Sequence, residues 1–517
     1  MLNDASDYES LMRLTRLAQR RAETRKWLDR ALRGRLAKLA GTALEVAVDI
    51  GDPAGKALAH RLEKDGSLEL AERLNKHSLE ARYRESVPLR EVSLVAVERV
   101  LSEYVATWTE SDASQQVRLA RLMSQLSARL GDLGRRREAL ELAHQAVARQ
   151  RCLASERPDE LRQELILGLT NLGLQLSEAG LQEEGLEATR EAVELCRDLA
   201  RERPVFESAL ADNLNNLVPI FHELGRWEEA LEASQEAVSI RRELARNEPA
   251  GHSPDLVASL VNLSVTLGDM ARAEGAVSAA REAIDLAREL DSQQPDTYRP
   301  LLASGLVNLG IQLGRADEPE EAQSASDEAV GLYRRLAEER PEAFRPDLAL
   351  SLIDLGIRWK GLKRRAVALA VTEEAVAIYR ELAGEEPRAF RPQLAMGLDN
   401  LGQRLKEADR QEEALAATQE AVALYRELAR QRPRRFDPLL AQGLNKLSFR
   451  LSKLGRHEEA FEVCDEGIRR LLPYFRQTPR IHGFTMALMR INYLLIASGT
   501  ALEPDRELLD QSKKPDA

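Results

Sequence analysis

One segment of the chain, residues 344–375, recurs along the sequence with a fixed period. Its Asp354-Leu355-Gly356 corresponds to Asn308-Leu309-Gly310 and to Asn400-Leu401-Gly402, which lie 46 residues before and after it. A fixed period of about 20 to 50 residues is typical of repeat arrays, in which each unit packs only against its neighbours. The period therefore constrains the fold more strongly than any single motif does.

One leucine in each unit marks the period and is called the anchor below. The anchors are Leu126, Leu172, Leu217, Leu263, Leu309, Leu355, Leu401 and Leu447, with Tyr493 in a ninth, partial unit; every step is 46 residues except one of 45, between Leu172 and Leu217. Apolar residues recur around each anchor at helical spacing, as in Leu306, Leu309 and Leu313, which predicts an amphipathic first helix. A second helix, residues 320–339 in this unit, carries small residues such as Ala322. The predicted fold class is all-α, with two helices in each unit.

Two sets of prolines punctuate the units. The first set follows each second helix and comprises Pro158, Pro204, Pro249, Pro295, Pro341, Pro387, Pro433 and Pro479. The second set is predicted to open the next first helix, where a missing N–H does no harm, and comprises Pro254, Pro300, Pro346, Pro392 and Pro438. Between the two sets the sequence predicts a loop, closed onto the core by an aromatic residue such as Phe344.

The sequence divides into three parts: residues 1–112 without a clear repeat, the array at 113–500, and a polar tail at 501–517. Residues 90–108 are predicted to form a degenerate half-repeat, because Val100 lies one period before Ala146. Residues 13–38 contain ten Lys or Arg against two acidic residues. Such a basic helical region could bind nucleic acid or anionic lipid, or form a solvated face that meets acidic partners; the second interpretation is favoured.

Motifs for chemistry or targeting are not found. Residues 49–56 read DIGDPAGK, but a phosphate loop needs four residues between its glycines and Ser or Thr after the Lys. The seven histidines show no metal-ligand spacing, and no constellation supplies a base, a nucleophile and an orienting group. The three cysteines form no CxxC pair, which predicts free thiols in a reducing cytosol. We therefore expect no enzyme, no cofactor, no metal, no signal peptide and no transmembrane segment.

The repeat columns resemble the tetratricopeptide repeat. Its pattern of apolar residue, Leu-Gly, large residue and two alanines is matched by Leu352, Leu355, Gly356, Trp359, Ala368 and Ala375. The resemblance covers residues 113–500, although each unit is longer than the standard repeat, as in kinesin light chain. It implies a right-handed superhelix whose first helices line an inner groove. It also implies binding of peptides or proteins, without chemistry.

The position before the anchor is a candidate site. It holds Gln125, Asn171, Asn216, Asn262, Asn308, Asp354, Asn400, Lys446 and Asn492, so six of nine residues are Asn. Asn is a poor former of helix interiors, and its carboxamide offers both a donor and an acceptor. Asn ladders line the groove in related repeat proteins such as O-linked N-acetylglucosamine transferase, so the resemblance implies that these Asn bind a peptide backbone. Alternatively, each Asn bonds the neighbouring repeat and fixes the superhelix; the sequence leaves both interpretations open.

Four lysines near the C-terminal end of the array form a second candidate: Lys360, Lys406, Lys446 and Lys453. They could favour an acidic segment or a free carboxylate, or be scattered surface charges. The leading hypothesis is a non-enzymatic scaffold or adaptor that binds a protein or peptide in the groove. The alternatives are a self-associating structural or regulatory subunit of a multiprotein signalling complex, and a nucleic-acid-binding or enzymatic activity in residues 1–112. The identity of the partner does not follow from the sequence.

Overall fold

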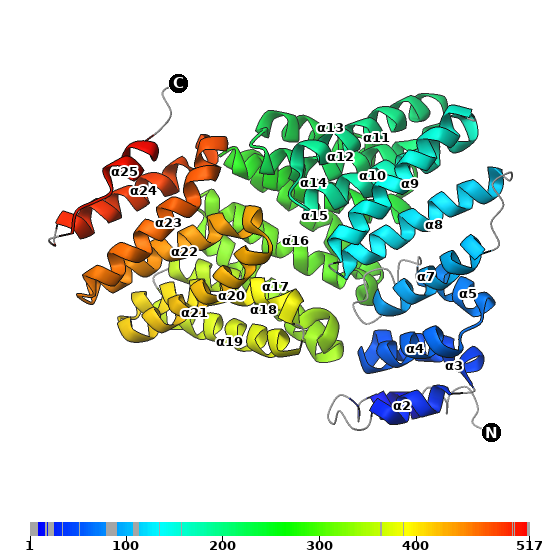
Figure 1. Cartoon of the computed structure of the whole chain (residues 1–517), viewed down its shortest axis with the longest axis horizontal. Helices are drawn as coiled ribbons and strands as arrows, with labels where there is room; N and C mark the ends of the chain where they lie inside the picture. Colours follow the sequence, from blue (N-terminus) through cyan, green and yellow to red (C-terminus); the bar gives the residue numbers. More distant parts are fainter. Residues whose placement is uncertain are drawn as a thin grey trace. The chain divides into compact units, whose positions relative to one another are not determined.

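The computed structural model of the chain is built from helices (Figure 1). It describes residues 9–15, 18, 25–33, 35–50, 52–78, 90–106, 113–133, 135–156, 158–361, 364–385, 387–498, 500 and 502–513. These residues include no β-strand, which confirms the predicted all-α class. They fall into two compact units: unit 1 comprises residues 1–220 and 339–343, and unit 2 comprises residues 221–338 and 344–517.

The first part of unit 1 is a group of shorter helices around its own apolar core. After helical residues 9–15 come α2 (Arg25–Leu32), α3 (Leu36–Ile50), α4 (Asp52–Asp65), α5 (Leu68–Ser78) and α7 (Arg90–Ala106). Leu28, Leu58 and Ala96 belong to one buried cluster that joins these helices. Residues 52–56, in the segment that resembles a phosphate loop, form the first turns of α4. The boundary expected at residues 109–112 lies outside the described residues.

The repeats of unit 1 follow as antiparallel helix pairs. They are α8 (Ala113–Asp132) with α9 (Arg136–Glu156), and α10 (Pro158–Glu178) with α11 (Gln182–Glu202). The next first helix, α12 (Glu207–Glu223), spans the division between the units. The anchors Leu126 and Leu172 are both buried, as the helical spacing predicts.

Unit 2 continues the same alternation of first and second helices. Its helices are α13 (Trp227–Asn247), α14 (Pro249–Asp269), α15 (Ala273–Gln293), α16 (Pro295–Arg315), α17 (Pro319–Glu339), α18 (Pro341–Gly361), α19 (Arg365–Glu385), α20 (Pro387–Glu407), α21 (Gln411–Gln431), α22 (Pro433–Lys453), α23 (His457–Gln477), α24 (Pro479–Ser498) and α25 (Arg506–Gln511). From α13 to α23 both helices of a repeat have 21 residues, so the length beyond a standard repeat is shared between them. Successive buried clusters run through the unit, each made of residues from neighbouring helices.

The predicted loop between the two sets of prolines is wrong. The first set opens the first helix: Pro249 and Pro295 stand at its first position, where the missing N–H costs nothing. The second set lies inside the helix, as Pro254 and Pro300 show. Phe344 therefore belongs to the first turn of α18 and packs into the core from there. Successive repeats are joined by a single residue, such as Gln294 (φ −141°, ψ 78°).

The one step of 45 residues is accommodated at the start of a first helix. Residues 204–206 form a 3-10 turn that leads into α12, so this first helix has 20 residues in place of 21. A 3-10 turn rises about 2.0 Å per residue against 1.5 Å in an α-helix. The tighter turn spans nearly the same length with one residue fewer, and the following anchors stay in phase.

Each repeat places one hydroxyl group between its two helices. Where the residue after the anchor is Gly, the facing residue of the second helix is Ser or Thr: a Cβ on Gly356 would lie 2.5 Å from Thr372 Oγ1. Where the residue after the anchor is Ser, the facing residue is Ala or Cys: Ser127 donates across the pair to the carbonyl of Ala139, and Ala143 faces it. The pairs are Ser127/Ala143, Gly173/Thr189, Ser264/Ala280, Gly310/Ser326, Gly356/Thr372, Gly402/Thr418 and Ser448/Cys464, with Val218/Ser234 as a variant. Close helix packing thus leaves room for a hydroxyl on one side only.

Candidate partner-binding surface

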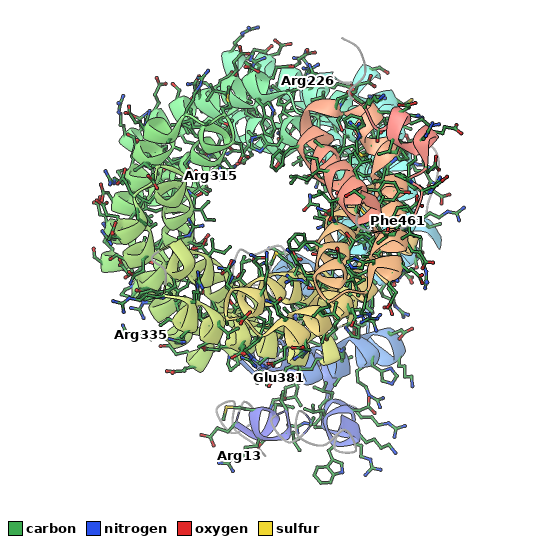
Figure 2. The ribbon with its side chains drawn as sticks, turned by 90° about the vertical axis from the view of Figure 1, so that its left-hand side faces the viewer. Arg13, Arg226, Arg315, Arg335, Glu381 and Phe461 are labelled. Atoms are coloured by element: carbon green, nitrogen blue, oxygen red, sulfur yellow. The ribbon has the colours of Figure 1, made fainter. Side chains whose placement is uncertain are left out.

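The first helices expose apolar side chains, mainly at the positions five residues before and two residues after the anchor. These two positions, seven residues apart on one helix face, are called the first-helix surface below. The large apolar residues exposed on it are Leu167 and Leu174 in unit 1, and Leu350, Ile357, Phe449, Leu488 and Leu495 in unit 2. In Figure 2, Arg315 of first helix α16 lies on the inner side of the curved row of unit 2 helices, and Arg335 of second helix α17 lies on the outer side.

The second helices differ sharply from the first helices in what they expose. Among the described residues from 113 onward, 14 large apolar side chains are exposed; 11 lie on first helices, and only Val367 lies on a second helix. Surface apolar groups are normal when scattered, so their segregation onto one set of helices is the informative feature. This asymmetry makes the first helices the candidate surface for a partner.

The second helices instead carry a ladder of ion pairs between successive repeats. Each pair joins an Arg to a Glu 40 residues later: Arg151–Glu191, Arg242–Glu282, Arg288–Glu328, Arg334–Glu374, Arg380–Glu420 and Arg426–Glu466. Both partners of Arg380–Glu420 are about half exposed, so water screens the attraction and each pair contributes little stability. In this ladder, charged side chains of the second helices pair with one another and not with a partner. Sequence inspection missed it, although its 40-residue spacing was visible.

The Asn side chains before the anchor make hydrogen bonds to the preceding repeat at three positions. Nδ2 of Asn308 donates to Ser264 Oγ (2.6 Å), and Nδ2 of Asn492 donates to Ser448 Oγ (2.7 Å). Nδ2 of Asn171 does the same to Ser127 Oγ (3.1 Å) in unit 1. The acceptor is in each case the Ser that follows the preceding anchor. These three amides therefore hold neighbouring first helices together.

The remaining members of this column lie in different surroundings. Asn216, Asn262 and Asn400 are half-buried, and Asn400 Nδ2 donates to the Met396 carbonyl of its own helix (3.0 Å). Asp354 is buried; it accepts from Ser326 (2.7 Å) and pairs with Arg358 (3.1 Å). Burial raises the pKa of the Asp354 carboxyl, and Arg358 and Ser326 partly offset that rise.

Two of the four predicted lysines meet at one aromatic ring. Nζ of Lys406 lies 4.9 Å from the centre of the Phe449 ring, and Nζ of Lys453 lies 5.6 Å from it. Lys446 is instead paired with Asp399 (2.5 Å). The side chain of Lys360 lies outside the described residues. The structure thus brings together Lys406 and Lys453, around an apolar ring that is 39% exposed.

Two buried arginines on the same two helices, α20 and α22, escaped sequence inspection. Arg404 and Arg450 stand three residues after their anchors and are each 5% exposed. Burial lowers the pKa of both guanidinium groups. Arg404 has an ion pair with Glu407 (3.1 Å), but Nε and Nη1 of both arginines have no hydrogen-bond partner among the described residues. Helical periodicity alone does not distinguish these arginines from exposed ones, and only the packing of neighbouring repeats shows that they are enclosed.

The described residues offer no group of three or more His, Cys, Asp or Glu side chains that could hold a metal ion. Cys196 and Cys464 are buried, and burial raises their thiol pKa values to about 11 and about 12. Such thiols stay protonated and unreactive near neutral pH. No helix in the searched part of the chain is long and apolar enough to cross a bilayer.

Comparison with known proteins gives two family matches. The family described as Tetratricopeptide repeat matches residues 119–153 and 210–245. The family described as Anaphase-promoting complex subunit 5 matches residues 247–298 and 394–432. No curated protein matches the chain.

Several solved structures are similar to this chain. One is a kinesin light chain with nearly identical TPR-like repeats from Podosopora anserina (19% identity, 43% of this chain and 98% of that chain, TM-score 0.33). A second is a Rap protein complexed with competence and sporulation factor (14% identity, 80% and 100%, TM-score 0.48). A third is a signal transduction ATPase with a tetratricopeptide repeat sensor from Pyrococcus horikoshii (13% identity, 91% and 66%, TM-score 0.41).

The repeated helix pairs carry the Leu-Gly and alanine columns, and the tetratricopeptide repeat family matches two segments of the array. These observations support a protein of the tetratricopeptide repeat superfamily.

Proposed function

We propose that the protein is a non-enzymatic interaction scaffold whose first-helix surface holds a peptide segment or a partner protein. The segregation of exposed apolar side chains onto the first helices carries this proposal. Burying such side chains against a partner contributes about 25 cal/mol for each Å² removed from water. Among the described residues from 113 onward, the second helices expose only Val367 as a large apolar side chain, and ion pairs link these helices from repeat to repeat.

The preferred partner of unit 2 has an apolar stretch followed by acidic groups. Leu350 and Ile357 of α18 supply an apolar band. One repeat later Lys406 of α20, and two repeats later Lys453 of α22, flank Phe449 of α22. The enclosed Arg450 of α22 adds a further cation. A carboxylate that binds here would contact several positive groups on a partly buried surface. Charge-assisted hydrogen bonds are stronger there than in bulk water.

The half-buried Asn side chains stand beside this band and would contribute hydrogen bonds to a bound backbone. Asn400 donates within its own helix and not to a serine of the preceding repeat. Asn171, Asn308 and Asn492 each donate to a serine of the preceding repeat, so their main role is to stabilise the stacking of neighbouring repeats.

The test uses peptides selected from a displayed random library on the full chain. The affinity of the best peptide is then measured by fluorescence anisotropy for wild type, Ile357→Asp and Val367→Asp. The two substituted residues are both 39% exposed, but Ile357 lies on a first helix and Val367 on a second helix. We expect Ile357→Asp to weaken binding about tenfold or more, and Val367→Asp to leave it unchanged. Equal affinities for all three proteins would contradict the proposal.

The acidic preference has its own variant. The double variant Lys406→Glu, Lys453→Glu should bind an acidic peptide more weakly than wild type does. The affinity should also depend less on salt concentration, because salt screens the attraction between exposed charges. Lys513→Glu is the matched control, because Lys513 is exposed and paired with Asp510 far from Phe449 in the sequence. An affinity and a salt dependence unchanged by the double substitution would exclude a role for the two lysines.

A further inference from the structure

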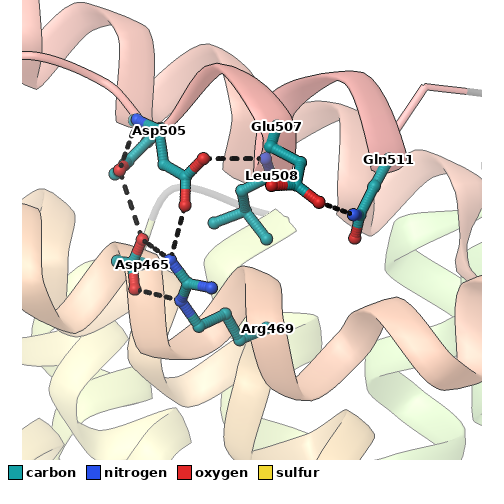
Figure 3. A network of polar contacts seen from close by, with 7 residues as sticks. Asp465, Arg469, Asp505, Glu507, Leu508 and Gln511 are labelled. Atoms are coloured by element: carbon teal, nitrogen blue, oxygen red, sulfur yellow. Dashed lines mark hydrogen bonds and ion pairs between the residues drawn. The ribbon is translucent and has the colours of Figure 1, made fainter.

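The ninth repeat has a full first helix but only a fragment of a second helix. Its α24 has 20 residues, whereas α25 has six, against 21 in the second helices of the preceding repeats of unit 2. Figure 3 shows how α25 is held: Arg469 of α23 binds Asp465 (2.6 Å) and Asp505 (2.7 Å), and Asp505 caps the helix through the N–H of Leu508. Leu508 is buried with Tyr493 in the core of unit 2. Within the described residues, the short α25 thus stands only at the start of the position that a second helix occupies in the preceding repeats.

The face that a second helix covers is well defined in the other repeats. It comprises the positions six and three residues before the anchor and one residue after it. In the eight preceding repeats the first of these positions is at most 3% exposed: Ala120, Ile166, Ala211, Val257, Ala303, Ala349, Ala395 and Ala441. The residue after the anchor is likewise buried in all eight, and at Gly310 it faces Ser326 and Ala322 of the second helix.

The same positions are open in α24. Ala487 is exposed, and Leu494 is 43% exposed. The adjoining Ile491 is 55% exposed. These residues, with Arg490, are called the open slot below. In the preceding repeats a second helix covers this face, so the exposed apolar residues of α24 offer a surface that fits a helix.

The residue at the centre of the open slot departs from the repeat pattern. Three residues before the anchor, the preceding repeats have Leu or Met, all buried, whereas the ninth has Arg490. Its Nε is buried and has no hydrogen-bond partner among the described residues. The sequence of α24 contains no acidic residue. The acidic residue that Arg490 influences is Asp510 of α25, whose carboxyl pKa is lowered mainly by Lys513 and to a smaller extent by Arg490.

We propose that the open slot docks an amphipathic helix of a partner protein, antiparallel to α24, which carries a carboxylate opposite Arg490 and a small residue opposite Leu494. The carboxylate completes the hydrogen bonding of a half-buried guanidinium whose Nε is buried and has no hydrogen-bond partner among the described residues. The small residue follows from the packing of the other repeats, where only one side of the helix pair carries a side chain larger than Ala or Cys at this contact. A second copy of the chain fits less well, because its own α24 would bring Arg490 against Arg490.

The probe is a labelled peptide built from the chain's own second helix α21, residues 411–431. It carries Thr418→Gly, which places a small residue opposite Leu494, and Ala421→Glu, three residues later on the same face. A control peptide carries Ala421→Lys in place of Ala421→Glu. Both are titrated with the full chain and followed by fluorescence anisotropy, and circular dichroism checks that each protein variant is folded.

We expect the Glu peptide to bind wild type about tenfold more tightly than the Lys peptide, as for one charge-assisted hydrogen bond. The Arg490→Glu variant should bind the Lys peptide more tightly than the Glu peptide, and the Leu494→Asp variant should bind both peptides more weakly than wild type does. Ile357→Asp should change neither, so failure of the first-helix proposal and failure of this one are distinguishable. Absence of saturable binding, or equal affinity of the two peptides for wild type and Arg490→Glu, would overturn the inference. A dimer in light scattering that Leu494→Asp abolishes would also overturn it and assign the slot to a second copy.

Discussion

Nδ2 of Asn308 lies 2.6 Å from Oγ of Ser264, which is 44 residues earlier in the sequence. Both side chains are buried, and the bond joins the first helices of two successive repeats. The same relationship recurs between Asn171 and Ser127 and between Asn492 and Ser448. In these repeats, the polar residue beside the anchor fixes how one repeat stacks on the next.

A double-mutant cycle on Asn308→Ala and Ser264→Ala should therefore reveal coupling. We expect an interaction energy of about 1 kcal/mol in the free energy of unfolding, because a buried hydrogen bond is lost by either substitution. Urea denaturation followed by circular dichroism measures it. Asn400→Ala is the control, since its amide bonds within its own helix (3.0 Å to Met396 O) and has no such serine partner. Additive effects at Asn308 and Ser264 would contradict a direct contact.

The single hydroxyl between paired helices can be moved from one helix to the other. Gly356→Ser alone should destabilise the protein by about 1–3 kcal/mol, because its Cβ would lie 2.5 Å from Thr372 Oγ1. Gly356→Ser combined with Thr372→Ala reproduces the Ser264/Ala280 arrangement and should recover most of the loss. Thermal unfolding of the two single variants and the double variant tests this expectation. A double variant less stable than Gly356→Ser would show that the two arrangements are not interchangeable.

Whole repeats should be removable. Deleting residues 387–432, which number 46, joins Glu386 to Pro433 and preserves both the single-residue linker and the proline at the first position of the helix. We expect a shorter, folded array with a native-like helical spectrum, since each repeat packs only on its neighbours. Deleting residues 387–406 instead shifts the buried and exposed faces out of phase and should expose apolar surface to a dye such as ANS. Equal dye binding by both deletions would refute the modular packing.

The three cysteines should react very differently. Cys152 is exposed, whereas Cys196 and Cys464 are buried with thiol pKa values raised to about 11 and about 12. At pH 8 a maleimide should label Cys152 within minutes and the other two only after unfolding, because the thiolate is the reactive form. Mass spectrometry of the labelled peptides identifies the site. Rapid native labelling at Cys464 would show that the end of unit 2 opens readily.

The pH dependence of the free energy of unfolding should also reflect the burial of Asp354. Burial raises the pKa of its carboxyl in the folded state, so the folded protein holds the proton more tightly than the unfolded chain. Wild type should therefore gain stability relative to Asp354→Asn as pH falls through the folded pKa, and lose that gain as pH rises. Denaturant unfolding of both proteins between pH 4 and pH 8 measures the difference. A difference that is constant across this range would exclude the shift.

The sequence predicted the repeat architecture because the anchor leucines and the alanine columns are periodic and mark buried faces directly. The sequence predicts the length of the repeat more readily than the residue at which each helix begins. Both Pro249 and Pro254 suit a helix start, and only the structure shows that the helix begins at Pro249. The candidate site was predicted in part. Lys406 and Lys453 do meet at Phe449, but Lys446 is taken by Asp399, a contact between repeats that no single repeat reveals. The enclosure of Arg450 depends on the same kind of contact.

The length of the first helices has a consequence for what can be recognised. A helix of 21 residues is about 31 Å tall, whereas the two positions of the first-helix surface are separated by only about 10 Å along it. The apolar residues at these two positions thus form a belt across the first helices of each unit, about one third as wide as the helices are long. A ligand lying across the helices would contact this belt through one apolar face, and its other side chains would remain in water. Such a surface selects for a narrow, one-sided ligand and tolerates wide variation in the rest of its sequence.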